Sequence, residues 1–143
     1  MIIVMTRYPS PLVQDLIDFE LQPLVLDKPA QAWRWRSYHS REWNRVENDS
    51  HAELLIRCVD DQWVWLTIAK GSPESGETFA QVHTDDSGGM IVELNAYDGV
   101  VTRVTRRHNQ KDIFTAEEAI PIFLQWMKSR SMASEFYLKN MDV

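Results

Sequence analysis

The sequence of 143 residues has a single cysteine and no hydrophobic run long enough to cross a membrane. With Cys58 alone, no intramolecular disulfide can form, which fits a reducing compartment. The apolar run at residues 1–5 is shorter than the apolar part of a secretory signal peptide. These absences predict a cytoplasmic protein.

The sequence also lacks the short motifs of phosphate sites and catalytic nucleophiles. Glycines stand at both ends of the loop at 71–76, but neither the P-loop nor the dinucleotide-binding spacing is present. No nucleophile elbow occurs either. His83 and Asp85 have no further metal ligand paired with them. Cys58 alternates with Leu54 and Ile56, so we expect a buried structural thiol. The sequence therefore predicts a protein that is not an enzyme, with no cofactor and no metal.

Positive charge is scarce, with 15 Lys and Arg against 21 Asp and Glu, a net charge of −6. Residues 51–100 hold 2 basic and 9 acidic side chains, a local charge of −7. Proteins that grip nucleic acid are usually basic, so this balance disfavours that class. The acidic stretch serves either ordinary solubility or the attraction of a basic partner.

The residues that are present favour one folded domain, 1–143, since 44% are hydrophobic and 25% are charged. Alternation of apolar and polar residues predicts strands. The expected strands are 33–38, 52–59, 63–69, 78–84, 90–97, 100–107 and a short one at 135–139. We expect 52–59 and 63–69 to form a hairpin, and Asp98-Gly99 to form the two-residue turn of another.

Two helices are expected, and the second has the clearer signals. Thr115 and Glu118 have the spacing of a capping box, and a broad apolar stripe follows them. Pro121 should kink this helix or shift its start. An earlier helix is expected to begin at Ser10 and to end by Pro23. The fold class is therefore α+β: an antiparallel meander of about five or six strands, with helices packed on one face.

Aromatic residues exceed what one apolar sheet face needs. In 63–69, Trp63 and Trp65 alternate with the apolar face, Trp33 and Trp35 share a face, and Phe79 can join them. One interpretation is a second small core covered by the amino-terminal segment. The other is an open aromatic surface that binds a partner, because Trp is enriched at binding hot spots.

A basic and aromatic segment offers a different hypothesis. Arginines alternate with tryptophans at 33–36, and more of both kinds follow at Tyr38, Arg41, Trp43 and Arg45. Single-strand nucleic-acid binders use such residues, because rings stack on bases and arginines hold phosphates. Nearby acidic residues dilute the patch, and the acidic stretch would repel phosphate.

From Thr78 onward the chain resembles a family of small bacterial immunity proteins from polymorphic-toxin systems. The likeness covers roughly residues 78–127 and rests on three parts in order. These are Thr78-Phe79-Ala80-Gln81-Val82-His83, then Gly88-Gly89-Met90-Ile91-Val92-Glu93-Leu94, and, after a hairpin, a helix from Thr115-Ala116-Glu117-Glu118-Ala119 to near Trp126. The resemblance implies an acidic, non-catalytic cytoplasmic protein that binds a cognate toxin, in many cases a basic one, and blocks its active site.

The expected partner-binding residues combine steering charges with aromatic anchors. They are Asp60, Asp61, Trp63, Glu74, Glu77, Phe79, Asp85, Asp86 and Glu93. A second copy of the chain is another candidate partner, since an exposed aromatic face or sheet edge can pair with itself. The alternative is a small-ligand-binding or enzymatic domain, with the aromatic face as a pocket and Glu93, His83 or Arg103 as its polar groups.

Overall fold

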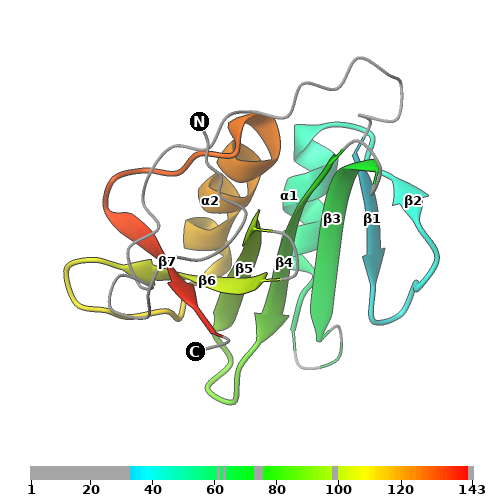
Figure 1. Ribbon diagram of the computed structural model, residues 1–143. Helices are drawn as coiled ribbons and strands as arrows, with labels where there is room; N and C mark the ends of the chain where they lie inside the picture. Colours follow the sequence, from blue (N-terminus) through cyan, green and yellow to red (C-terminus); the bar gives the residue numbers. More distant parts are fainter. Residues whose placement is uncertain (1–32, 61, 63, 73–75, 98–99, 142–143) are drawn as a thin grey trace.

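The computed structural model describes residues 33–60, 62, 64–72, 76–97 and 100–141. In this part of the chain, seven strands form one antiparallel sheet in the order β2-β1-β3-β4-β5-β6-β7 (Figure 1). The strands are β1 (Arg34–Ser37), β2 (Asn44–Arg45), β3 (Trp65–Ser72), β4 (Gly76–Thr84), β5 (Met90–Tyr97), β6 (Val100–Arg106) and β7 (Phe136–Asn140). The α+β class is confirmed, with one or two strands more than expected. The helix expected from Ser10 lies outside the described residues.

Helices α1 (Asp49–Arg57) and α2 (Ala116–Ser129) lie side by side on one face of the sheet (Figure 1). Arg57 pairs with Glu117, and the ammonium of Lys128 lies 2.5 Å from the carboxylate of Asp49. The core forms between these helices and the sheet, and its largest fully buried side chains are Trp126, Phe114, Phe123, Ile56, Leu66 and Ile68. No helix in the described part of the chain has the length and apolar character of a membrane span.

Helix α2 begins as its sequence predicts. The Thr115 hydroxyl accepts a hydrogen bond from the Glu118 amide at 3.2 Å, and the Glu118 carboxylate accepts one from the Thr115 amide at 2.9 Å. This capping box satisfies amide groups that have no partner within the helix. Pro121 lies inside the helix, where its missing N–H removes one backbone hydrogen bond. The helix nevertheless continues to Ser129, because its apolar face is buried.

Helix α1 replaces an expected strand, so the prediction for 52–59 is wrong. Asn48 caps the helix by accepting a hydrogen bond from the His51 amide at 2.8 Å. The buried positions have helical spacing, and they are Ala52, Leu55 and Ile56. Strand β3 consequently pairs with β1 and β4, and the expected hairpin between 52–59 and 63–69 does not form.

The environment of Cys58 also differs from the prediction. Cys58 is the C-cap residue of α1, and it is exposed rather than buried. The alternation with Leu54 and Ile56 does not apply in a helix, where Leu54 is 59% exposed while Ile56 is fully buried. The expectation of a buried structural thiol is therefore wrong.

The tryptophans are divided between the two faces of the sheet. Trp35 is paired in register with Ile68 of the core, and its ring meets His51 of α1 edge-on at a centroid distance of 6.2 Å. Trp33 also packs against the core. Trp65 belongs to the opposite face, because its neighbour Leu66 is buried under the helices. Trp33 and Trp35 therefore share a face, as expected, but it is the core face and not the face of Trp65, so the expected aromatic surface does not include them. Trp63 lies outside the described residues.

Candidate functional site

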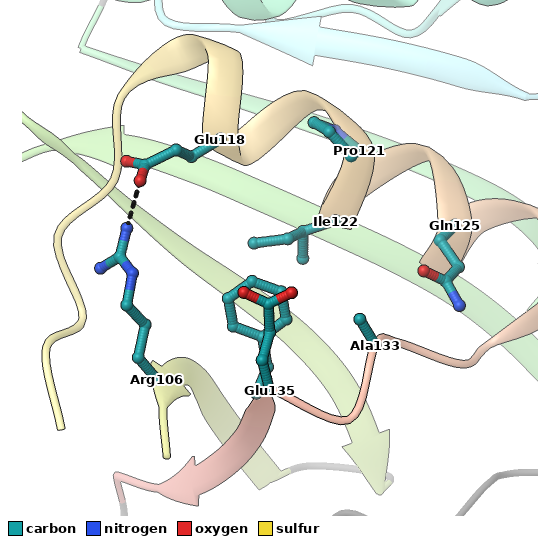
Figure 2. Close-up of a pocket in the computed structure, with 8 residues that line it drawn as sticks. Arg106, Glu118, Pro121, Ile122, Gln125, Ala133 and Glu135 are labelled. Atoms are coloured by element: carbon teal, nitrogen blue, oxygen red, sulfur yellow. Dashed lines mark ion pairs between the residues drawn. The ribbon is translucent and has the colours of Figure 1, made fainter. Parts of the chain in front are cut away.

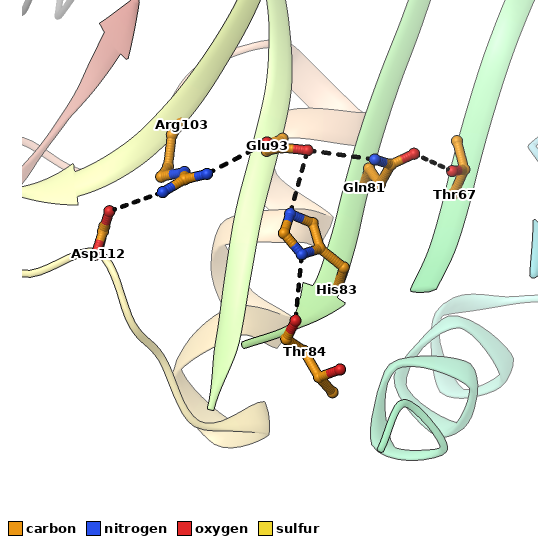
Figure 3. A network of polar contacts seen from close by, with 7 residues as sticks. All are labelled: Thr67, Gln81, His83, Thr84, Glu93, Arg103 and Asp112. Carbon is orange, nitrogen blue, oxygen red and sulfur yellow. Dashed lines mark hydrogen bonds and ion pairs between the residues drawn. The ribbon is translucent and has the colours of Figure 1, made fainter. Parts of the chain in front are cut away.

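A row of polar side chains crosses the face of the sheet opposite α1 and α2. Strand register aligns one residue from each of six adjacent strands: Arg36, Thr67, Gln81, Glu93, Arg103 and Lys139. Their neighbours Leu66, Val82 and Val92 are buried in the core, so the row points away from the helices. We call this side the polar face, and Figure 3 shows the centre of its row.

Glu93 of β5 is the centre of a hydrogen-bonded network on the polar face (Figure 3). One carboxylate oxygen accepts from the Gln81 amide at 3.2 Å and lies 3.5 Å from the Nε2 atom of His83. The other oxygen lies 3.8 Å from the guanidinium of Arg103. The Glu93 side chain is only 16% exposed, so these partners replace water around its charge.

The network continues beyond Glu93 in both directions. The Thr67 hydroxyl donates to the Gln81 amide oxygen at 2.6 Å, and Arg103 lies 3.2 Å from the Asp112 carboxylate. Each charged group therefore has an opposite charge in contact with it. Such a network fixes the rotamers of its members and keeps the polar face rigid.

Contact between His83 and Glu93 shifts both of their pKa values. Hydrogen bonding to the Glu93 carboxylate raises the pKa of His83, and hydrogen bonding to His83 lowers the pKa of Glu93. The Glu93 carboxylate is therefore ionised at neutral pH. A carboxylate with a lowered pKa is a weak proton acceptor, so this geometry suits charge pairing better than general-base catalysis.

An open groove of about 420 Å³ lies beside this network, over β1, β3 and β4. It is lined by Arg36, Val64, Trp65, Thr67, Gln81 and His83. The Arg36 guanidinium also lies 4.5 Å from the ring centroid of Trp43, which is 39% exposed. The groove thus offers an aromatic wall, a cation and hydrogen-bonding groups.

Three of the expected acidic residues gather at one end of the sheet. Asp60 follows α1, while Asp85 and Asp86 lie in the turn between β4 and β5. The Asp85 carboxylate accepts hydrogen bonds from the amides of Ser87 and Gly89, each at 3.0 Å, so it holds the turn. Hydrogen bonds lower the pKa of Asp85, and the one from the Ser87 side chain has the largest effect. Asp60 and Asp86 are exposed, and the Asp60 carboxylate accepts a hydrogen bond from the Gln62 amide at 2.8 Å.

The remaining expected residues are separated from that end. Glu77 lies near the start of β4, at the far end of the strand, and its carboxylate lies 2.6 Å from the guanidinium of Arg34. Phe79 is half-buried on the polar face, and Glu93 lies at its centre. Asp61, Trp63 and Glu74 lie outside the described residues. The structure therefore does not bring the predicted binding residues into one patch.

Sequence reasoning missed Thr67 and Gln81 as members of the candidate site, and it placed Arg36 only in the basic and aromatic segment. Gln81 had a usable signal, since it alternates with the apolar residues Ala80 and Val82 and must therefore lie on the face of Glu93. That Arg36 lies beside Thr67 had no sequence signal, because this contact depends on the pairing of β1 with β3 across the intervening helix.

Among the described residues, no group of three or more His, Cys, Asp or Glu side chains is placed to hold a metal ion. Comparison of the chain with family models, curated proteins and solved structures gives no match.

Proposed function

We propose that this protein is a non-enzymatic immunity protein that binds a cognate toxin in the cytoplasm and neutralises it. One observation carries the proposal: three exposed carboxylates lie at the same end of the sheet, spread from β3 to β7, with the basic residues Arg107 and Lys111 also at that end. Asp60 and Asp86 lie there, and Glu135 joins them because β7 begins at the same end. We call these three residues the acidic end. Exposed carboxylates, together with the net charge of −6, speed the encounter with a partner of opposite charge, which favours a basic toxin.

The polar face supports binding over catalysis. Its three titratable candidates, His83, Glu93 and Arg103, already neutralise one another within the protein. A catalytic base or acid also needs an unsatisfied contact for its substrate. The resemblance to immunity proteins, which act by binding alone, agrees with this arrangement.

The proposal is tested by a pull-down from the source cell's lysate with the tagged protein, followed by mass spectrometry. The retained partner is then expressed in bacteria with and without this protein. We expect a stoichiometric basic protein that arrests growth alone and is harmless when this protein is co-expressed. A retained protein that is harmless by itself, or an arrest that co-expression does not relieve, contradicts the proposal.

A small-ligand-binding or enzymatic domain is the second candidate function, and the groove on the polar face favours it. Its volume of about 420 Å³ lies within the ~300–1,000 Å³ range of small-molecule sites, and polar groups converge on it. Titration of isotope-labelled protein with mixtures of metabolites, followed by NMR, tests this function. Shifts confined to Thr67, Gln81 and His83 would favour it, and their absence from every mixture would exclude it.

A further inference from the structure

The proposed function assigns no role to a cavity that lies at the acidic end. It lies between α2 and the start of β7 and has a volume of about 240 Å³ (Figure 2). This volume is below the ~300–1,000 Å³ of sites that hold drug-sized ligands, so the cavity suits a single long side chain. Its walls come from α2, from the end of β6 and from the residues that lead into β7.

The floor of this cavity is apolar. Three apolar side chains line it, Pro121, Ile122 and Phe136, and Figure 2 shows Ile122 pointing from α2 toward the segment that leads into β7. Ile122 is 3% exposed and belongs to the core, so the floor is fixed by the packing of the whole fold. Such a surface can bury the methylene stem of a long side chain.

The rim of the cavity offers hydrogen-bond acceptors. The Gln125 amide nitrogen donates to the Ser131 hydroxyl at 3.2 Å, which leaves its amide oxygen available. Figure 2 shows this oxygen, and the carboxylate of Glu135, beside the floor. Glu135 has no cation within ion-pair distance among the described residues, and Glu118 supplies a second carboxylate.

Among the described residues that line the cavity, Arg106 is the one cation, and it is already bound to the protein. Arg106 lies 2.8 Å from the Glu118 carboxylate, donates to the Ile113 carbonyl at 3.0 Å, and stacks 4.2 Å from the ring centroid of Phe114. Its donors are therefore engaged, whereas the acceptors of Glu135 and Gln125 are not. The cavity can therefore bind a positively charged hydrogen-bond donor.

We infer that this cavity receives a long basic side chain, arginine or lysine, from the toxin. The inference rests on the proposed function and names the anchor of the interface. The stem of the basic side chain lies on Ile122 and Phe136, and its charged head reaches Glu135 and the Gln125 oxygen. A charge-assisted pair on an apolar floor is the arrangement in which such contacts contribute most to binding.

The site itself can be tested without the toxin. The probe is N-acetyl-arginine amide, and the control probe is N-acetyl-citrulline amide, which has nearly the same shape without the charge. We expect the arginine probe to shift the methyl NMR signals of Ile122 and Ala133 saturably, and the citrulline probe to bind at least about tenfold more weakly. Equal binding of the two probes, or no binding by either, would overturn the inference.

Two variants assign the effect to the cavity. Glu135→Gln keeps the size of an exposed side chain and should abolish the preference for arginine. Ala133→Leu narrows the cavity without a change of charge and should weaken binding of the arginine probe. Glu117→Gln is the matched control, because Glu117 is exposed, pairs with Arg57 and does not line the cavity. Equal loss in Glu117→Gln would reduce the effect to net charge and contradict the site.

The same variants separate this inference from the proposed function. We expect the captured toxin to bind Glu135→Gln roughly tenfold or more weakly than wild type, with Glu117→Gln near wild type. If the toxin binds all three equally, the inference fails while the immunity function stands. If no growth-arresting partner exists, the proposed function fails, and the toxin anchor with it, whether or not the arginine probe binds.

Discussion

The two faces of the sheet are built from the same strands, yet different interactions stabilise their side chains. Toward the helices, Ile68, Val82 and Leu94 are buried in a continuous apolar core. On the polar face, Gln81 and Glu93 occupy the alternate positions and are held by hydrogen bonds and charge. The first face gains its stability from dense packing, which tolerates little change. The second is fixed by directional contacts, each of modest net value.

The largest expected difference between the faces is in the cost of truncation. Phe123→Ala empties a fully buried site under α2 and should lower the free energy of unfolding by about 3–5 kcal/mol. Gln81→Ala, on the polar face, should cost about 1 kcal/mol, since it removes two hydrogen bonds of a half-buried side chain. Urea unfolding of both variants measures the contrast, and equal costs would contradict it.

A smaller effect is expected at the centre of the polar face. Glu93→Gln removes the charge that Arg103 and His83 share, and should cost about 1–3 kcal/mol. The pKa of His83 should also fall toward its ordinary value, because its raised pKa comes first from Glu93. NMR titration of the imidazole measures this. Asp112→Asn is the control, since the Asp112 carboxylate pairs with Arg103 and not with His83. If this control lowers the pKa of His83 as much as Glu93→Gln does, the effect comes from the loss of any negative charge and not from the contact with Glu93.

His83 and Glu93 should make the polar face contribute to the pH dependence of stability. Because the pKa of His83 is raised in the folded protein, its protonation stabilises the fold fully below the ordinary pKa of about 6.5. This stabilisation is lost as the pH rises through the raised pKa. Because the pKa of Glu93 is lowered in the folded protein, its ionised carboxylate stabilises the fold fully above about pH 4.5. This stabilisation is lost as the pH falls through the lowered pKa. We therefore expect His83→Asn to flatten the decline in stability, measured by urea unfolding, as the pH rises from about 6.5 through the raised pKa. An unchanged decline would assign it to other groups.

The smallest expected effect is kinetic and concerns the acidic end. Asp86→Lys should slow association with the captured partner by a few-fold and weaken its salt dependence, because Asp86 is exposed. Stopped-flow measurements at several salt concentrations test this. Glu47→Lys, an exposed reversal near the opposite end of the sheet, is the matched control and should have less effect. An unchanged association rate for Asp86→Lys would remove steering from the mechanism.

The two helices show how far sequence reasoning reaches. Helix α2 was predictable because its capping box and its 14-residue apolar stripe agree with each other. Helix α1 has only nine residues, and its apolar positions fit a period of two about as well as a helical period. Asn48 was the signal that distinguishes them, since an Asn before Asp49 is a good N-cap. Whether a short amphipathic segment forms a helix or a strand depends on which elements pack against its apolar side chains.

The candidate site was predictable only within single strands. That Glu93 points away from Val92 and Leu94 follows from alternation and is confirmed. That it meets Gln81 and Arg103 depends on register between strands, which alternation within one strand does not set. The cavity beside Glu135 has no sequence signal, because it forms only where β7 returns beside α2.

The strand order of the sheet has a consequence for how the chain is made. Each strand from β3 to β7 hydrogen-bonds to a strand synthesised before it. A chain leaving the ribosome can therefore add β4, β5 and β6 one at a time, with short loop closures that favour rapid folding, whereas β7 follows only after α2. The contacts between helices instead join residues 60 and 79 positions apart. We expect the nascent sheet to wait for α2, with its apolar face uncovered until the last quarter of the chain emerges.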